Sequence, residues 1–272
     1  MLHSITSYFK FLWQSKNEHG VHSPFVFNLV TKCLYDKKQY AEYARLNTHR
    51  KLLLKNKSTI DVNDFGAGSK VFTSNTRAIN KIAKTAGISS KRAELLFRIV
   101  HYFQPSTILE IGTSLGLATA ALALGNPKAK IITLEGCPNT LATANENFQN
   151  SKFHHETSGP NSKVEFVNTE FESYLKNLKP ETLNLKPETI DLVYFDGNHS
   201  KKATLDYFNL LSPTVTNDTV WIFDDIHWSV DMEAAWERIK NHPKVTVTID
   251  NFQWGLVFFR TEQEKEHFTI RC

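Results

Sequence analysis

Two acidic clusters follow short apolar runs in the second half of the chain. The first, D-G-N-H-S, comes after the run V-Y-F and contains Asp196 and His199. The second, D-D-I-H-W, comes after W-I-F and begins with Asp224 and Asp225. Such runs are typical of buried parallel strands, and a doubly wound sheet keeps its ligands beyond the C-terminal ends of its strands. The fourth and fifth predicted strands are neighbours in that topology, so we expect Asp196, Asp224 and Asp225 to converge.

Three facing carboxylates repel one another unless a cation binds between them or some of them hold protons. Oxygen ligands of this kind suit Mg²⁺, with Mn²⁺ or Ca²⁺ as alternatives. The metal would hold a substrate oxygen, and His199, with an ordinary pKa of about 6.5, could take its proton near neutral pH. Two simpler interpretations stay open. An aspartate at a strand end often caps the next helix, and a histidine in such a turn can be purely structural.

A glycine turn stands at the start of the regular part of the chain. Residues 107–116 read T-I-L-E-I-G-T-S-L-G, a strand-like run and a turn with Gly112 and Gly116, before a helix-like pattern. Glycine lets the backbone approach a ligand closely and adopt positive φ. Glu135 follows the next predicted strand, where a carboxylate can accept hydrogen bonds from both hydroxyls of a ribose. The pattern predicts an adenosine-type ligand, with an ordinary strand, turn and helix as the alternative.

The spacing of the glycines argues against a dinucleotide. A pyrophosphate site needs G-x-G-x-x-G, whereas this turn has three residues between its glycines and a carboxylate, Glu110, before them. A negative group repels phosphate but suits a ligand that carries ammonium and sulfonium charges. The combination resembles the first motif of class I S-adenosylmethionine-dependent methyltransferases. The resemblance implies that S-adenosyl-L-methionine is the cofactor and that its binding residues are Glu110, Gly112, Ser114, Gly116, Glu135, Glu170, Phe171 and Asp196.

From about residue 89 to 260 the chain resembles the metal-dependent O-methyltransferases, the group that contains the catechol and caffeoyl-CoA enzymes. Asp196 falls on the first metal aspartate of that family, and Asp224 and Asp225 fall on its acidic pair. The catechol enzyme has Asp-Asn at the pair, so Asp225 is a departure. His199 lies where the catechol enzyme has a catalytic lysine. Macrolide-sugar O-methyltransferases are more similar here, because they place a histidine three residues after a metal aspartate.

The elements that would position these residues alternate regularly from Thr107 onward. We predict strands at 108–111, 131–134, 164–167, 192–195 and 220–223, helices at 117–124, 139–148, 171–178, 201–211 and 228–240, and two closing strands at 245–249 and 256–259. The predicted fold is α/β, a Rossmann-like doubly wound methyltransferase sheet of seven strands. In the resembling family the last strand is antiparallel.

The first part of the chain lacks this alternation. We predict an N-terminal helical and lid segment over residues 1–86 and the methyltransferase domain over 87–272, with helices at 5–13, 24–35, 42–56, 80–85 and 89–103. The glycine-rich residues 64–69 follow a poor strand and are interpreted as a flexible lid. A hexapeptide, N-L-K-P-E-T, occurs at 177–182 and again at 184–189. It predicts a surface loop without an assigned function.

Composition sets few limits on function. The chain has 272 residues, a formal net charge of +4 and three cysteines without metal or redox spacing. We therefore expect a cytoplasmic protein with no membrane association. We expect O-methylation of a small hydroxylated substrate, with nucleic acid disfavoured as a partner and a homodimer left open. The alternatives are N-methylation of RNA or protein, and a non-catalytic protein that retains the fold.

Overall fold

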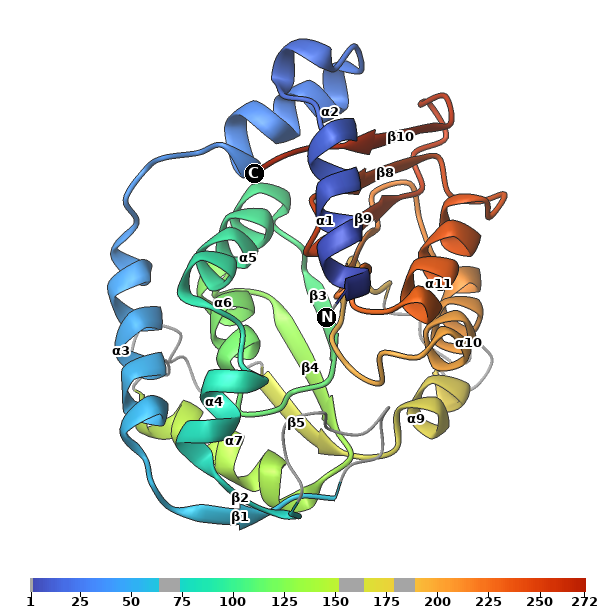
Figure 1. Cartoon of the computed structure of the whole chain (residues 1–272). Helices are drawn as coiled ribbons and strands as arrows, with labels where there is room; N and C mark the ends of the chain where they lie inside the picture. Colours follow the sequence, from blue (N-terminus) through green and yellow to red (C-terminus); the bar gives the residue numbers. More distant parts are fainter. Residues whose placement is uncertain (1, 64–73, 152–163, 179–188) are drawn as a thin grey trace. The chain divides into compact units, whose positions relative to one another are not determined.

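The computed structural model describes residues 2–63, 74–151, 164–178 and 189–272 (Figure 1). The chain forms two compact units. The terminal unit comprises Met1–Tyr35 and Glu172–Cys272, and the central unit comprises Asp36–Phe171. The predicted lid at 64–69 and residues 179–188 of the repeated hexapeptides lie outside the described residues. The predicted domain boundary between residues 86 and 87 stays a prediction.

In the central unit a parallel sheet carries the glycine turn. Its strands are β3 (Thr107–Ile111), β4 (Lys130–Glu135) and β5 (Val164–Asn168), in the order β3-β4-β5. The helices α5 (Ser90–Phe103), α6 (Leu117–Gly125) and α7 (Pro138–Asn150) belong to the same unit. Every residue of α6 is buried, which fits a helix that is apolar all round. These strands and helices were all predicted, with bounds that differ by one or two residues.

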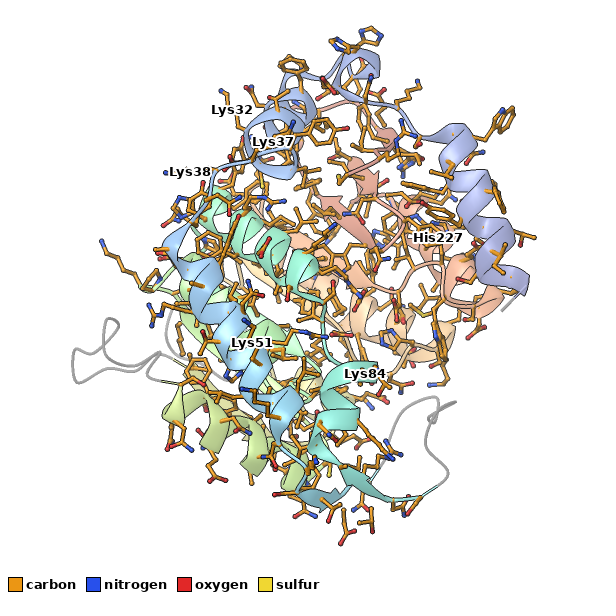
Figure 2. The ribbon with its side chains drawn as sticks, turned by 60° about the vertical axis from the view of Figure 1, so that its left-hand side comes forward. Lys32, Lys37, Lys38, Lys51, Lys84 and His227 are labelled. Carbon is orange, nitrogen blue, oxygen red and sulfur yellow. The ribbon has the colours of Figure 1, made fainter. Side chains whose placement is uncertain are left out.

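The first part of the central unit is helical, as predicted, but it also contains a small hairpin. Its elements are α3 (Ala41–Lys55), β1 (Thr59–Asp61), β2 (Thr76–Ala78) and α4 (Ile79–Thr85). Strands β1 and β2 pair antiparallel. The hairpin was not predicted, because residues 58–63 have little of the apolar alternation that indicates a strand. Figure 2 labels Lys51 on α3 and Lys84 on α4, both exposed to solvent.

The terminal unit holds the strands that end in the acidic clusters. Strands β6 (Leu192–Phe195) and β7 (Val220–Asp224) are parallel, and β9 (Trp254–Phe258) is antiparallel to both β7 and β8 (Val247–Asp250). Helices α10 (Lys201–Leu211) and α11 (Val230–Lys240) belong to the same unit. An additional strand, β10 (Glu266–Thr269), pairs parallel with β8. The prediction of seven strands therefore misses one, and β10 brings the long strands of the two units to eight.

The N-terminal helices of the terminal unit are α1 (Leu2–Gln14) and α2 (Pro24–Leu29), the latter extended by a π-turn at Val30–Leu34. The short helices η1 (Glu18–Gly20) and η4 (Ser212–Thr214) complete this unit, and α9 (Phe171–Asn177) begins at its boundary. In the part of the chain that the structure describes, no helix is both long and apolar enough to cross a membrane.

Gly255 in β9 generates a prediction about stability. A Cβ atom added there would lie 2.5 Å from the buried indole ring of Trp236 on α11, so Gly255→Ala forces the ring or the strand to move. We expect the free energy of unfolding to fall by about 1–3 kcal/mol, measured by urea denaturation. Gly20→Ala is the matched control, since its added Cβ meets only the flexible side chain of Lys16. Equal stability of the two variants would contradict this packing.

Candidate functional site

The glycine turn after β3 has a strained backbone. Gly112, Ser114 and Gly116 have φ values of 106°, 49° and 77°, and Gly116 is the N-cap of α6. The amides of Gly112 and Thr113 both donate to the carbonyl of Leu134, 3.0 Å away. The turn is therefore fastened to the end of β4 by its own backbone. Glycine satisfies the left-handed requirement at two of the three positions, and Ser114 adopts it at a cost.

Glu135 compensates for that cost. Its Oε2 accepts the amide of Ser114 at 2.9 Å, and its Oε1 accepts the amide of Cys137 at 3.0 Å. Hydrogen bonds to an ionised acceptor are stronger than neutral ones, so the carboxylate stabilises both the turn and the start of α7. Each oxygen has a second lone pair. The side chain is half-buried.

Glu110 lies beneath the turn, fully buried. Its Oε2 accepts hydrogen bonds from Thr119 at 2.5 Å and Thr133 at 2.6 Å, and its Oε1 has no hydrogen-bond partner among the described residues. Burial, opposed by these two hydroxyls and assisted by the charge of Glu135, raises the pKa of Glu110 to about 7. The two threonines were not predicted. Thr133 pairs with Glu110 in the register of β3 and β4. Aligning the two predicted strands side by side would therefore have placed Thr133 next to Glu110.

Glu170 and Phe171 follow β5 in the same unit, at the third strand end of the sheet. Glu170 is exposed and Phe171 is half-buried. The central unit thus contains all of the predicted cofactor residues except Asp196.

The terminal unit brings two of the three aspartates together. Asp196 follows β6 and Asp224 ends β7, and the parallel register of these strands makes them neighbours. The hydroxyl of Tyr194 lies 3.3 Å from an oxygen of each carboxylate. Tyr194 was not predicted as a site residue, although it stands two residues before Asp196 and so faces the same side of the strand. Burial, then the charge of Asp224, raises the pKa of Asp196 well above its ordinary value.

Asp225 differs from the other two aspartates in its backbone conformation. Its φ is 52°, and its amide donates to Oδ1 of Asp224 at 2.7 Å and to the carbonyl of Gln253 at 3.0 Å. Among the described residues, no group of three His, Cys, Asp or Glu side chains is arranged to hold a metal. The pair formed by Asp196 and Asp224 still fits Mg²⁺, which often uses two carboxylates and keeps several waters.

His199 lies beside this pair, with Nε2 3.5 Å from Oδ1 of Asp196. Burial opposes its charge, but the hydrogen bond to Asp196 and the charges of Asp196, Asp225 and Asp224 outweigh burial and raise its pKa to about 9. In this arrangement His199 therefore holds its proton at neutral pH. The expectation of a histidine with an ordinary pKa near 6.5 is wrong for this arrangement, because sequence spacing does not show that the ring is enclosed by carboxylates.

A second histidine of the terminal unit links elements of the fold through both of its ring nitrogens. His227, labelled in Figure 2, lies 2.7 Å from Glu233 through Nδ1 and 2.8 Å from Asp250 through Nε2, and its ring stacks on Phe252. Both ring nitrogens are thus occupied, and the two carboxylates raise its pKa against the effect of burial. His227 joins the loop after β7 to α11 and to the end of β8.

Comparison with known proteins agrees with this arrangement. Residues 109–226 match the family model described as "Methyltransferase domain". This part of the chain is similar to a methyltransferase domain. The match begins one residue before Glu110 and ends one residue after Asp225, so it contains every predicted site residue of both units.

Solved methyltransferases share the fold over most of the chain. A methyltransferase of Podospora anserina, PaMTH1, with bound SAH has a TM-score of 0.59 at 15% identity, covering 88% of this chain and 97% of its own. An O-methyltransferase of Bacillus cereus in complex with SAH has a TM-score of 0.54 at 18% identity, covering 86% and 96%. TomG, an O-methyltransferase of Streptomyces achromogenes involved in tomaymycin synthesis, in complex with SAM, has a TM-score of 0.51 at 17% identity, covering 90% and 99%. The Rossmann-like α/β fold predicted from the sequence is confirmed.

The burial of Glu110 predicts a pH dependence of stability. Between pH 4.5 and about 7 the folded chain holds a proton on Glu110 that the unfolded chain releases, so the free energy of unfolding falls as pH rises through this window. Glu110→Gln removes this dependence. Relative to the wild type, we expect the variant to gain about 3 kcal/mol between pH 4.5 and pH 8, measured by urea denaturation. Glu146→Gln, at an exposed position of α7, is the control. A Glu110→Gln difference that is flat with pH would show that Glu110 is ionised when buried.

Proposed function

We propose that the chain transfers a methyl group from S-adenosyl-L-methionine to an oxygen of a small hydroxylated molecule. The observation that carries this proposal is the glycine turn held by the Glu135 carboxylate, in a fold shared with proteins that bind SAM or SAH. Gly112, Ser114 and Gly116 shape the turn for close approach of the cofactor, and Glu135 accepts hydrogen bonds from the ribose hydroxyls. Glu170 and Phe171 are assigned to the adenine, and Asp196 to the methyl end of the cofactor.

The acidic cluster is assigned to the acceptor. In methyl transfer, an acceptor oxygen attacks the methyl carbon, the carbon–sulfur bond breaks, and its electron pair stays on sulfur. The acceptor must also lose a proton. We assign that proton to the pair of Asp196 and His199, whose side chains lie 3.5 Å apart beside the acceptor side of the site. The hydroxyl of Tyr194 fixes the positions of Asp196 and Asp224.

A divalent ion fits the acidic pair. Asp196 and Asp224 would hold Mg²⁺, or Mn²⁺ or Ca²⁺, and Asp225 is the expected third ligand. When bound, the ion would neutralise the two carboxylates and lower the pKa of an acceptor hydroxyl. All-oxygen donors from two neighbouring strand ends support this part of the proposal.

RNA as an acceptor is favoured by one observation. Residues 36–103 contain fourteen lysines and arginines but five aspartates and glutamates, a net charge of +9 in a chain whose total is +4. Exposed members of this segment include Lys37, Lys38, Lys51 and Lys84 (Figure 2). Lysines of this kind suit phosphate groups. RNA is therefore the second candidate acceptor.

The cofactor assignment predicts the effect of Glu135→Gln. An amide keeps one acceptor for the neighbouring backbone but loses the charge that strengthens the ribose hydrogen bonds, so we expect the Kd for S-adenosylmethionine to rise about 10–100-fold. Isothermal titration calorimetry measures it, and urea denaturation verifies that the variant is folded. Glu165→Gln, exposed on β5, should bind like the wild type. Absence of binding to the wild-type chain would end the proposal.

The acidic cluster predicts a separation of binding from turnover. Asp196→Asn and Asp224→Asn should each lower turnover at least about 100-fold, measured as S-adenosylhomocysteine release with catechol, a hexose, a phenolic acyl-CoA thioester and an RNA as acceptors. Because Asp224 is assigned to the acceptor side, the cofactor Kd of Asp224→Asn should change little. Asp218→Asn, at an exposed position before β7, is the control. EDTA treatment should abolish turnover, and Mg²⁺ should restore it.

Two results would contradict parts of this account. Full turnover after EDTA treatment would exclude the metal while leaving methyl transfer intact. Methylation of the RNA but of none of the small acceptors would replace the small-molecule proposal with the second candidate.

A further inference from the structure

Helix α1 has two apolar faces. Ser7 and Phe11 on the inner face are buried. Ile5, Phe9 and Trp13 form a row on the opposite face, spaced four residues apart, so their side chains are neighbours along the helix. The exposed fractions of these three residues are 54%, 67% and 87%. An apolar row of this kind is unusual on a surface, where large apolar residues are usually scattered singly.

The inner face holds α1 firmly on the terminal unit (Figure 1). The rings of Tyr8 and Phe11 lie 4.9 and 5.4 Å from the ring of Phe252. Beyond the helix, the amide of Lys16 donates to the carbonyl of Thr269 at 2.8 Å. The outer row is therefore presented by a helix whose packing is already complete on its other side.

The size of the row indicates what can cover it. Aromatic side chains bury about 150–250 Å² each, so Ile5, Phe9 and Trp13 together offer roughly 500 Å². A stable interface with a second protein needs about 800 Å² per partner. A second copy of the chain is thus not favoured, whereas a lipid surface needs only a few apolar side chains to enter it.

The exposed charge of α1 itself is basic, and one carboxylate, Glu233, lies 3.7 Å from His3 on the helix. Helix α1 contains no aspartate or glutamate, and its Lys10 is exposed. Lys16 follows the helix, and its carbonyl accepts the amide of Arg271, so a third exposed cation lies at the same end. Lysines and arginines beside exposed tryptophan, phenylalanine and aliphatic side chains are the pattern of helices that lie in the interface of an anionic bilayer.

We propose that α1 binds the surface of an anionic lipid bilayer, with Ile5, Phe9 and Trp13 inserted among the lipid headgroups and Lys10, Lys16 and Arg271 at the lipid phosphates. The helix lies along the surface and does not span it. This site goes beyond methyl transfer and does not depend on it. It is an alternative to the expectation, drawn from sequence alone, that no membrane takes part.

Flotation of the full chain with phosphatidylcholine vesicles, with and without phosphatidylglycerol, tests the proposal. The wild type should bind the vesicles that contain phosphatidylglycerol. The double variant Phe9→Glu with Trp13→Glu should bind at least about tenfold more weakly than Ser4→Glu with Gln14→Glu, which adds the same charge to α1 away from the row. The emission of Trp13 should shift to shorter wavelength on binding. Trp13→Phe should lose that shift but still bind.

Three results would overturn the proposal. They are absence of vesicle binding by the wild type, equal weakening in the two double variants, and a wild-type dimer in sedimentation that Phe9→Glu with Trp13→Glu dissociates. Affinity for S-adenosylmethionine, measured in parallel, should be the same in all of these variants. Failure at the vesicle therefore leaves the proposed methyl transfer untouched.

Discussion

The candidate site depends on one carboxylate that accepts two backbone amides. Glu135 holds Ser114 in a left-handed conformation and begins α7 through Cys137. Without this charge the serine would carry an uncompensated strain of about 1–3 kcal/mol, and the turn between Gly112 and Gly116 would lose its shape. The same carboxylate is proposed to accept the ribose hydroxyls of the cofactor. Turn geometry and ligand recognition are thus combined in one side chain.

The carboxylates of the site have different surroundings, and these surroundings assign their tasks. Glu110 is fully buried and accepts hydrogen bonds from Thr119 and Thr133, and burial raises its pKa to about 7. Glu135 accepts the amides of Ser114 and Cys137, which direct it at the turn. Burial and the charge of Asp224 raise the pKa of Asp196, and a protonated His199 lies beside it. This arrangement suits the binding of a cation or the uptake of a proton.

The sequence predicted features that depend on local pattern. The alternation of strands and helices, the glycine turn and the acidic strand ends all follow from periodicity and residue type, and the structure has them. It did not predict β10, because a four-residue strand with two exposed residues has little apolar signal. It also did not predict the pKa of His199 or the sharing of Tyr194 by two aspartates. These depend on which side chains a register brings together, and that information is not local.

The most direct test of the central claim is a crystal structure of the chain with S-adenosylhomocysteine. We predict that both ribose hydroxyls donate to Glu135 while the amides of Ser114 and Cys137 keep their hydrogen bonds to the same carboxylate. A cofactor bound elsewhere, or a ribose that leaves Glu135 without contact, would contradict the account.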